Sequence, residues 1–159
     1  MNTVSKPESF PTQFETPDQS PGFLVWQVAN DWQHRQRLAL KKLGLTHVQF
    51  VLLACTGWLN QSSQPVSQVR LATYAHLDIM MTSQVLRTLE KKGLVERASH
   101  PTDPRAKSIR LTAAGQSLIT RALPVVEETD RQFFDILGDQ RPHWVQLLSS
   151  LLRAHQTPP

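Results

Sequence analysis

The sequence predicts a mainly α-helical domain with one small β-hairpin, and three observations support this fold class. Apolar residues recur at helical spacing from Phe23 to Leu43 and again after about Ala113. Between these stretches, residues 71–112 have the pattern of a short helix, a tight turn, an amphipathic helix stopped by glycine, and a hairpin. A length of 159 residues suits one domain with a real core and is short for two.

The first third of the chain is predicted to hold a tail and two helices. Residues 1–20 are rich in Pro, Ser, Thr and Gln, and we expect a disordered tail because such a segment buries too little apolar surface to offset its ordering entropy. Gly44 stops the first helix. Thr46 is a suitable N-cap for a second helix that ends near Gly57, and the polar residues 60–65 form a loop.

The helices that follow are predicted from their caps and breakers. Ser67 is the expected N-cap of a short helix, and Asp78 that of a longer helix which Gly93 stops. After the hairpin, two more helical stretches cover about residues 113–137 and 140–154. The order is typical of a winged helix-turn-helix with extra helices at both termini.

Pro124 lies inside the apolar stripe of the helix predicted after the hairpin. Proline removes one backbone hydrogen bond and clashes with the carbonyl of the residue four positions earlier, here Thr120. We therefore expect a kink or a break at this position.

The positive charge of the chain is concentrated on one helix and one hairpin. The formal net charge is +4, and residues 87–110, with seven cationic and three acidic side chains, have a net charge of +4 by themselves. Such a surface suits a polyanionic partner.

A single cysteine excludes an internal disulfide framework. Since the sequence has neither a secretory leader nor an apolar run of about 18 residues, we expect a soluble, cytoplasmic protein.

The amphipathic helix over residues 79–91 has two faces. At about 100° per residue, one face carries Ile79, Thr82, Val85, Leu86 and Leu89. The opposite face carries Met80, Ser83, Gln84, Arg87 and Lys91. Short polar side chains followed by cationic ones are what a recognition helix uses to read bases in the major groove. An ordinary solvated face has the same composition, and it is the short helix before and the hairpin after that favour DNA reading.

The hairpin is predicted to form a wing. Residues 94–99 and 107–112 can pair as two strands, and two prolines stiffen a tip that contains Asp103 and Arg105. A rigid cationic tip can insert Arg105 into the narrow minor groove, where the potential is most negative, while Asp103 holds the guanidinium. The alternative is a simple exposed turn, and the preceding helix favours the wing.

Four motifs give the sequence a family resemblance. They are LA at Leu71-Ala72, LEKKGLVER from Leu89 to Arg97, DPRAK from Asp103 to Lys107, and LTAAG from Leu111 to Gly115. In this combination they resemble the MarR family of bacterial transcription regulators, and the order of elements matches from about Phe23 to Ala154.

The resemblance implies a homodimer, joined by the first and last helices, that reads a pseudo-palindromic operator in double-stranded DNA. It places Ser83, Gln84 and Arg87 at recognition-helix positions, and Asp103 and Arg105 at the wing. Gln84 departs from the arginine often found there. In domain terms, residues 21–45 and 113–156 would form the dimerisation region and residues 46–112 the winged helix-turn-helix. The implied function is a repressor released by a small-molecule effector.

The predicted DNA-binding residues therefore come from two helices and the hairpin. They are Ser67, Gln68, Met80, Met81, Ser83, Gln84, Arg87, Lys91, Arg97, Asp103, Arg105 and Lys107. The methionines offer apolar contact to thymine methyl groups. Lys91, Arg97 and Lys107 neutralise phosphates, and the backbone N–H groups at Ser67 and Gln68 can bind a phosphate.

The other chemical interpretations of the sequence stay open or are disfavoured. Trp26, Trp32 and Trp58 are candidates for a pocket that takes a small lipophilic or phenolic effector, as the resemblance implies, with plain core packing as the alternative. Cys55 is a candidate redox switch, although its apolar neighbours favour an inert buried thiol. The scattered histidines indicate no metal site, and no catalytic constellation or phosphate-binding glycine loop indicates an enzyme or a cofactor. A winged helix that binds an acidic protein instead of an operator is the remaining alternative.

Overall fold

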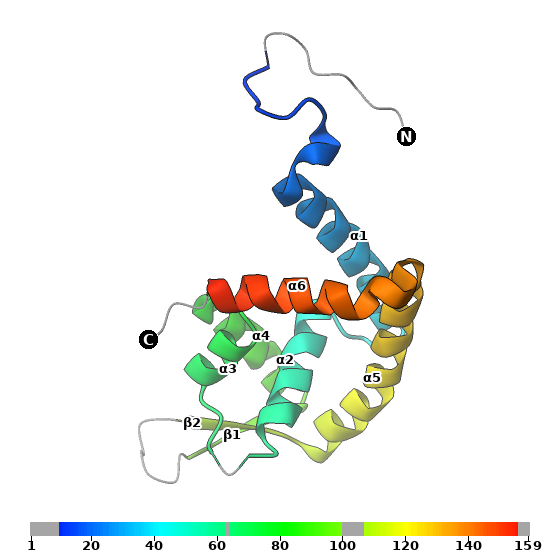
Figure 1. Cartoon of the computed structure of the whole chain (residues 1–159). Helices are drawn as coiled ribbons and strands as arrows, with labels where there is room; N and C mark the ends of the chain where they lie inside the picture. The colour runs from blue at the N-terminus through cyan, green and yellow to red at the C-terminus, as the bar shows by residue number, and fades with distance from the viewer. Residues whose placement is uncertain (1–9, 63, 100–106, 156–159) are drawn as a thin grey trace.

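The computed structural model describes residues 10–62, 64–99 and 107–155. In chain order the elements are η1 (Pro17–Gln19), α1 (Pro21–Lys41), α2 (His47–Leu59), α3 (Gln68–Tyr74), α4 (Ile79–Lys91), β1 (Val95–Ser99), β2 (Lys107–Leu111), α5 (Ala113–Phe134), η2 (Asp135–Gln140) and α6 (Arg141–Ala154). Figure 1 shows α2, α3, α4 and the hairpin gathered into one lobe, beside which α5 runs upward and from which α1 projects. The predicted fold class, a mainly helical chain with one antiparallel hairpin, is confirmed.

The end of the first helix and the start of the second are set by the residues that the sequence singled out, whereas α2 continues past the predicted stop at Gly57 to Leu59. The Thr46 hydroxyl accepts the backbone N–H of Gln49 (3.2 Å), and the Gln49 side chain accepts the N–H of Thr46 (3.2 Å), which makes a capping box. Gly44 and Gly93 have φ angles of +66° and +67°, the left-handed conformation that turns the chain after α1 and after α4.

The hairpin is fixed to the rest of the lobe along β2. The two strands pair antiparallel from Val95 opposite Leu111 to Ser99 opposite Lys107. The N–H of Ile109 donates to the carbonyl of Val66 (2.8 Å) in the segment before α3. Asn60, at the end of α2, donates to the carbonyl of Ile109 (3.1 Å) and accepts the N–H of Leu111 (3.2 Å). These bonds satisfy backbone groups that β2 would otherwise leave unpaired at its free edge.

We predicted a kink or a break at Pro124; helix α5 continues through this residue, so the break is wrong, while the kink stays a prediction. Ala122 and Val126, on either side of the proline, are both buried, and α5 packs along α1 and α2. This packing offsets the cost of a proline inside a helix, about 3 kcal/mol. The helix ends at Phe134, slightly before the predicted residue 137, and η2 follows it.

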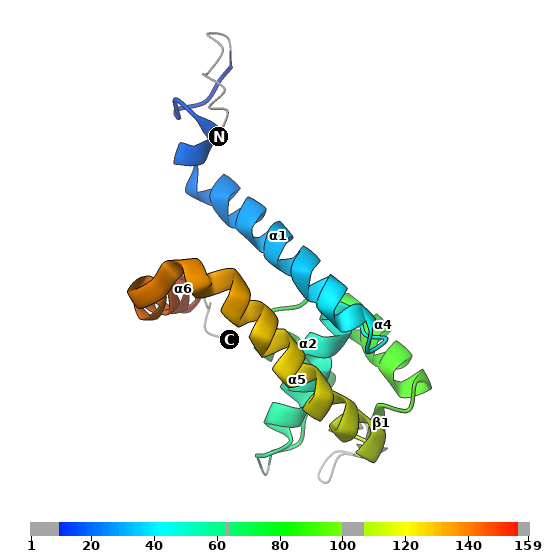
Figure 2. The ribbon, with the colours of Figure 1, turned by 90° about the vertical axis from the view of Figure 1, so that its right-hand side faces the viewer.

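The hydrophobic core lies inside the lobe and leaves the two terminal helices largely outside. Leu52 and Leu53 of α2, Leu86 of α4 and Ile109 of β2 are among its buried members. Helix α6 contributes no buried residue, and α1 contributes only Gln36 and Leu40 from its C-terminal half. Figure 2 shows α1 extending well beyond the lobe and α6 set apart from α2 and α4. Within the described part of the chain, no helix has the length and apolar character needed to span a membrane.

Candidate nucleic-acid interface

Helix α4 begins with a strong cap and a tight turn. One carboxylate oxygen of Asp78 accepts the backbone N–H groups of Met80 (2.8 Å) and Met81 (3.0 Å). The turn before it closes when the N–H of Leu77 donates to the carbonyl of Ala72 (3.0 Å), and it requires a positive φ of +51° at His76. The first turn of α4 is thus fixed in the arrangement that a helix-turn-helix needs, with its outer face open.

The two predicted faces of α4 are largely those of the structure. Thr82, Leu86 and Leu89 are fully buried against the lobe. Ile79, predicted on the same face, is 42% exposed, because it occupies the first position of the helix, above the core. Thr82 offsets the burial of its hydroxyl by donating to the carbonyl of Asp78 (2.8 Å).

The structure brings the predicted reading residues of α4 together on its exposed side. Arg87 lies over Ser83: its Nη2 donates to the Ser83 hydroxyl (3.2 Å) and its Nε to the Ser83 carbonyl (3.4 Å). Gln84 and Lys91 are exposed. Met80 is 70% exposed, an unusual position for a large apolar side chain unless another molecule covers it. The exposed face of α4 therefore combines hydrogen-bonding, cationic and apolar groups, and no other part of the described chain covers them.

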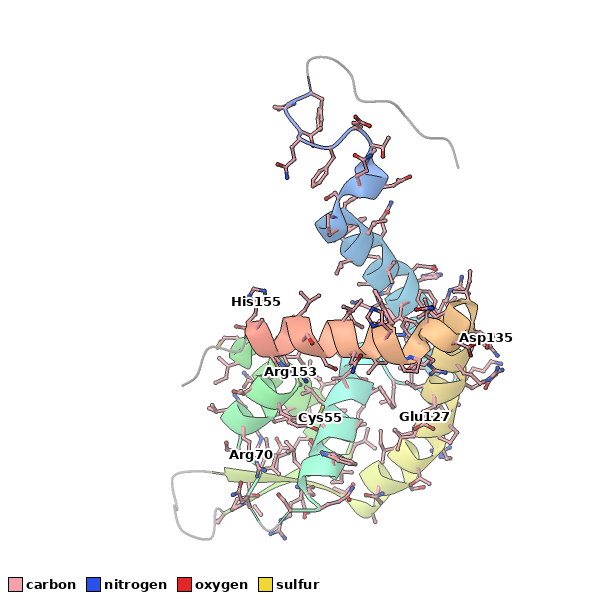
Figure 3. The ribbon with its side chains drawn as sticks, in the orientation of Figure 1. Cys55, Arg70, Glu127, Asp135, Arg153 and His155 are labelled. Atoms are coloured by element: carbon pink, nitrogen blue, oxygen red, sulfur yellow. The ribbon has the colours of Figure 1, made fainter. Side chains whose placement is uncertain are left out.

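The N-terminus of helix α3 is capped by the side chain of Ser67. The Ser67 hydroxyl accepts the N–H of Arg70 (3.1 Å), and both Ser67 and Gln68 are half-buried. The Arg70 guanidinium is held by the preceding loop, donating to the carbonyls of Gln64 (3.1 Å) and Pro65 (3.3 Å). Figure 3 shows Arg70 at the base of the lobe, near the hairpin. Because the Ser67 hydroxyl is engaged in this cap, the predicted phosphate contact at Ser67 and Gln68 would be made by their backbone N–H groups.

The hairpin cations are placed differently from one another. Arg97, predicted to neutralise a phosphate, is partly buried, and its Nε lies 3.3 Å from a carboxylate oxygen of Glu90 in the last turn of α4. This ion pair links β1 to α4. Lys107 lies at the start of β2, opposite Ser99. Asp103 and Arg105, the predicted tip residues, lie outside the described residues.

The three tryptophans predicted to share an effector pocket do not come together. Trp26 is 63% exposed near the start of α1, where its ring stacks on Phe23. Trp32 donates through Nε1 to a carboxylate oxygen of Asp130 (2.7 Å). Trp58 lines a groove of about 570 Å³ to which neither of the others contributes.

That groove lies between α2, α3 and α5, and its lining is largely apolar. It is formed by Ala54, Cys55, Gly57, Trp58, Gln61, Tyr74, Gln116, Ile119 and Leu123. Cys55 is half-buried on α2 (Figure 3), and burial raises the pKa of its thiol. A raised pKa keeps the thiol protonated near neutral pH, which argues against a redox switch. The described residues contain no cluster of His, Cys, Asp and Glu that could hold a metal ion.

Sequence reasoning missed a polar cluster that joins α1 to α5 and α2. Gln36 is fully buried and donates to Asp130 (2.6 Å), which also accepts from Trp32. His47, at the start of α2, contacts Trp32 edge to face, with ring centroids 5.0 Å apart. Burial lowers the pKa of His47; nearby Asp130 raises it, and Arg37 lowers it further. No local spacing could have indicated this cluster, because Asp130 lies more than 90 residues from its partners on α1.

Comparison with known proteins agrees with this geometry. A family model described as "MarR family" matches residues 45–107, which run from just before α2 through β1 to the first residue of β2. The HTH-type transcriptional regulator YdcH of Bacillus subtilis (strain 168) is 45% identical over 123 residues, or 77% of this chain and 84% of that protein. The chain belongs to the MarR family.

Two solved MarR-type structures extend the comparison to the terminal helices. Rv2887, a MarR family protein of Mycobacterium tuberculosis in complex with salicylic acid, is 32% identical, with a TM-score of 0.65 over 84% of this chain and 98% of that one. CouR of Rhodococcus jostii RHA1, bound to p-coumaroyl-CoA, is 25% identical, with a TM-score of 0.76 over 93% and 99% of the two chains. The helices outside the lobe therefore belong to the MarR arrangement as well.

Proposed function

We propose that this protein is a cytoplasmic, homodimeric transcription repressor that binds a pseudo-palindromic operator in double-stranded DNA. The observation that carries the proposal is the exposed face of α4, where Arg87 lies over Ser83 beside Gln84 and Met80. Two relatives support it: Rv2887 is named as a transcriptional repressor, and CouR has a structure bound to a 23-mer DNA duplex.

Dimerisation explains the apolar surface of the terminal helices. The N-terminal half of α1 and the whole of α6 expose large apolar side chains: Phe23, Leu24, Val25, Trp26, Val28, Val145, Leu147, Leu148, Leu151 and Leu152. So many exposed large apolar side chains on two helices are costly in water unless a second molecule covers them. Two lobes also double the DNA contact, and half-sites one helical turn apart, about 34 Å, suit a two-fold dimer. Light scattering at micromolar concentration should give the mass of a dimer, and a monomer mass would reject this part of the proposal.

In the complex, Ser83, Gln84 and Arg87 would read base edges in the major groove. Met80 and Met81 would contact thymine methyl groups, while Lys91 and Lys107 would neutralise phosphates. Arg105 would enter the minor groove from the hairpin tip. Arg97, held by Glu90, would act mainly on the orientation of the hairpin.

The decisive experiment is selection of bound sequences from a random duplex pool at near-physiological salt. An inverted repeat with half-sites about one turn apart is expected. Unrelated sequences, bound weakly and only at low salt, would mean that the basic face is non-specific and would favour a protein-binding winged helix.

The groove between α2, α3 and α5 is the proposed effector site. Its apolar lining, with Trp58 and Tyr74 at its edges, suits a small aromatic ligand. Rv2887 in complex with salicylic acid and CouR bound to p-coumaroyl-CoA support this ligand class. Titration of the selected operator complex with salicylate should release the DNA. Trp58→Ala should weaken that release relative to the wild type while it leaves operator affinity without salicylate unchanged, and unchanged release would place the ligand elsewhere.

A further inference from the structure

The lysine that follows α4 lies at the junction of three helices. Lys92 is the C-cap of α4, and its ammonium group donates to the carbonyl of Gly44 (3.0 Å) and to the side-chain oxygen of Gln49 (3.2 Å). Gly44 belongs to the turn that ends α1, and Gln49 lies in the first turn of α2. One side chain thus joins the end of the recognition helix to the corner between α1 and α2.

The acceptors of Lys92 are themselves held in place. Gln49 is 8% exposed, and the oxygen that accepts from Lys92 also accepts the backbone N–H of Thr46 in the capping box. The Gly44 carbonyl lies just after the C-terminus of α1, where the helix dipole is negative and favours a cation. Hydrogen bonds from a charged donor are stronger than neutral ones, so this contact restrains the end of α4 more than an ordinary surface bond would.

We propose that Lys92 is a positioning residue that sets the orientation of the recognition helix relative to α1, and that it does not bind a DNA phosphate. The inference rests on the proposed function. Since α1 carries the proposed dimer contact, a restraint between α1 and α4 also fixes the separation of the two recognition helices. Both lysines are exposed, but Lys91 lies on the reading face of α4, where we propose that it contacts phosphate.

A second contact restrains the same end of α4 from the other side. Glu90 pairs with Arg97 of β1 (3.3 Å), so the last turn of the helix is tied both to the hairpin and to the α1–α2 corner. Loss of Lys92 would leave α4 attached to the hairpin and packed in the core through Leu86 and Leu89, but without its link to the α1–α2 corner. This predicts poorer geometry on the operator with no loss of fold.

The test compares Lys92→Met with Lys91→Met on the selected operator. Each substitution keeps an unbranched apolar stem and removes the charge. Affinity is measured over a range of salt concentrations, on the operator and on the same duplex with one base pair inserted between the half-sites. Circular dichroism confirms that each variant is folded, and Lys92→Gln replaces Lys92→Met if the latter aggregates.

Lys92→Met is expected to weaken operator binding by about three- to tenfold, to leave the salt dependence unchanged, and to reduce the preference for the correct spacing. Lys91→Met is expected to reduce the slope of log affinity against log salt by about 1.8, because a dimer loses two phosphate contacts. Lys92→Arg, which keeps a cationic donor, should stay close to the wild type.

A reduced salt slope for Lys92→Met, matching that of Lys91→Met, would show that the ammonium binds phosphate and would overturn the inference. Unchanged affinity and unchanged spacing preference would overturn it as well. A wild-type protein that selects no inverted repeat would instead reject the proposed function, and the inference with it.

Discussion

Replacing Gly115 with alanine tests the contact between the start of α5 and the end of α4. Gly115 is buried in the first turn of α5, and a Cβ atom built there would overlap the backbone carbonyl oxygen of Leu94. That carbonyl also accepts the N–H of Thr112 (3.1 Å), and the Thr112 hydroxyl donates to the carbonyl of Gly93 (2.6 Å) while it accepts the N–H of Gly115 (3.0 Å). The LTAAG motif thus needs a glycine at position 115 because the backbone of Leu94 lies too close for a side chain.

The expected cost follows from these contacts. Relieving the overlap means moving two backbone segments apart, for which overpacking costs about 1–3 kcal/mol. The movement weakens about two hydrogen bonds of the Thr112 cap, at about 1 kcal/mol each. Alanine gains about 1 kcal/mol over glycine in a helix, which offsets part of the loss. The free energy of unfolding should therefore fall by about 2–4 kcal/mol.

Urea unfolding at a fixed protomer concentration measures this change, because dimerisation makes stability depend on concentration. With a slope of about 2 kcal/mol per molar urea, the midpoint of Gly115→Ala should fall by about 1–2 M. Gly22→Ala is the matched control, since a Cβ at Gly22 in α1 meets no atom within 4 Å. Its midpoint should stay level or rise slightly. A Gly115→Ala midpoint equal to that of the control would refute the reasoning.

Three further predictions concern Arg87 of the interface, His47 of the polar cluster and Cys55 of the groove. Arg87→Ala should cost about 1–3 kcal/mol of operator affinity and relax specificity at one position per half-site, whereas an equal loss on random duplex would remove Arg87 from base reading. The pKa of His47 is lowered in the folded chain, so the unfolded chain binds more protons below about pH 6.5 and stability should fall as the pH drops through that range. In urea unfolding, His47→Gln should flatten this fall between pH 7.5 and 5.5, and an unflattened curve would assign the fall to another group. Cys55 should react slowly with a thiol reagent at pH 7 in the folded protein and rapidly in urea, and Cys55→Ser should bind the operator normally. Rapid labelling of the folded protein would restore the redox interpretation.

The elements with local signals were the ones that the sequence predicted well. Thr46, Asp78 and Gly93 are caps and stops whose effect depends on the adjacent backbone alone, and each ends or starts a helix as expected. The inner face of α4 followed from its periodicity, apart from Ile79 at its first position. Pro124 shows the limit of such reasoning, because its local cost is real but the packing of α5 on α1 and α2 outweighs it.

The parts of the site that depend on distant partners could not be predicted. Lys92 has the same residue type as its neighbour Lys91, yet its ammonium group donates to the carbonyl of Gly44, far away in the chain. Whether a cation contacts only solvent or also a carbonyl depends on the turn that packs beside it. For Lys92 that turn contains Gly44, which lies 48 residues earlier in the chain. Sequence alone likewise grouped three tryptophans as pocket candidates, although only Trp58 lines the groove, while Trp32 binds Asp130 and Trp26 stacks on Phe23.

Helix α1 provides the route by which events at the proposed dimer interface would reach DNA. Its N-terminal half exposes the apolar side chains proposed to meet the partner, while Gln36 and Trp32, further along, bind Asp130 of α5. Its end contacts Lys92 of the recognition helix. An effector in the groove proposed as its site would contact α2 and α5, the two helices to which α1 is attached. Because a ligand shifts an equilibrium only by its differential affinity for the two states, release of DNA requires that the groove differ in width between them. Because α1 is attached to both α2 and α5, a difference in groove width would change the spacing of the two recognition helices.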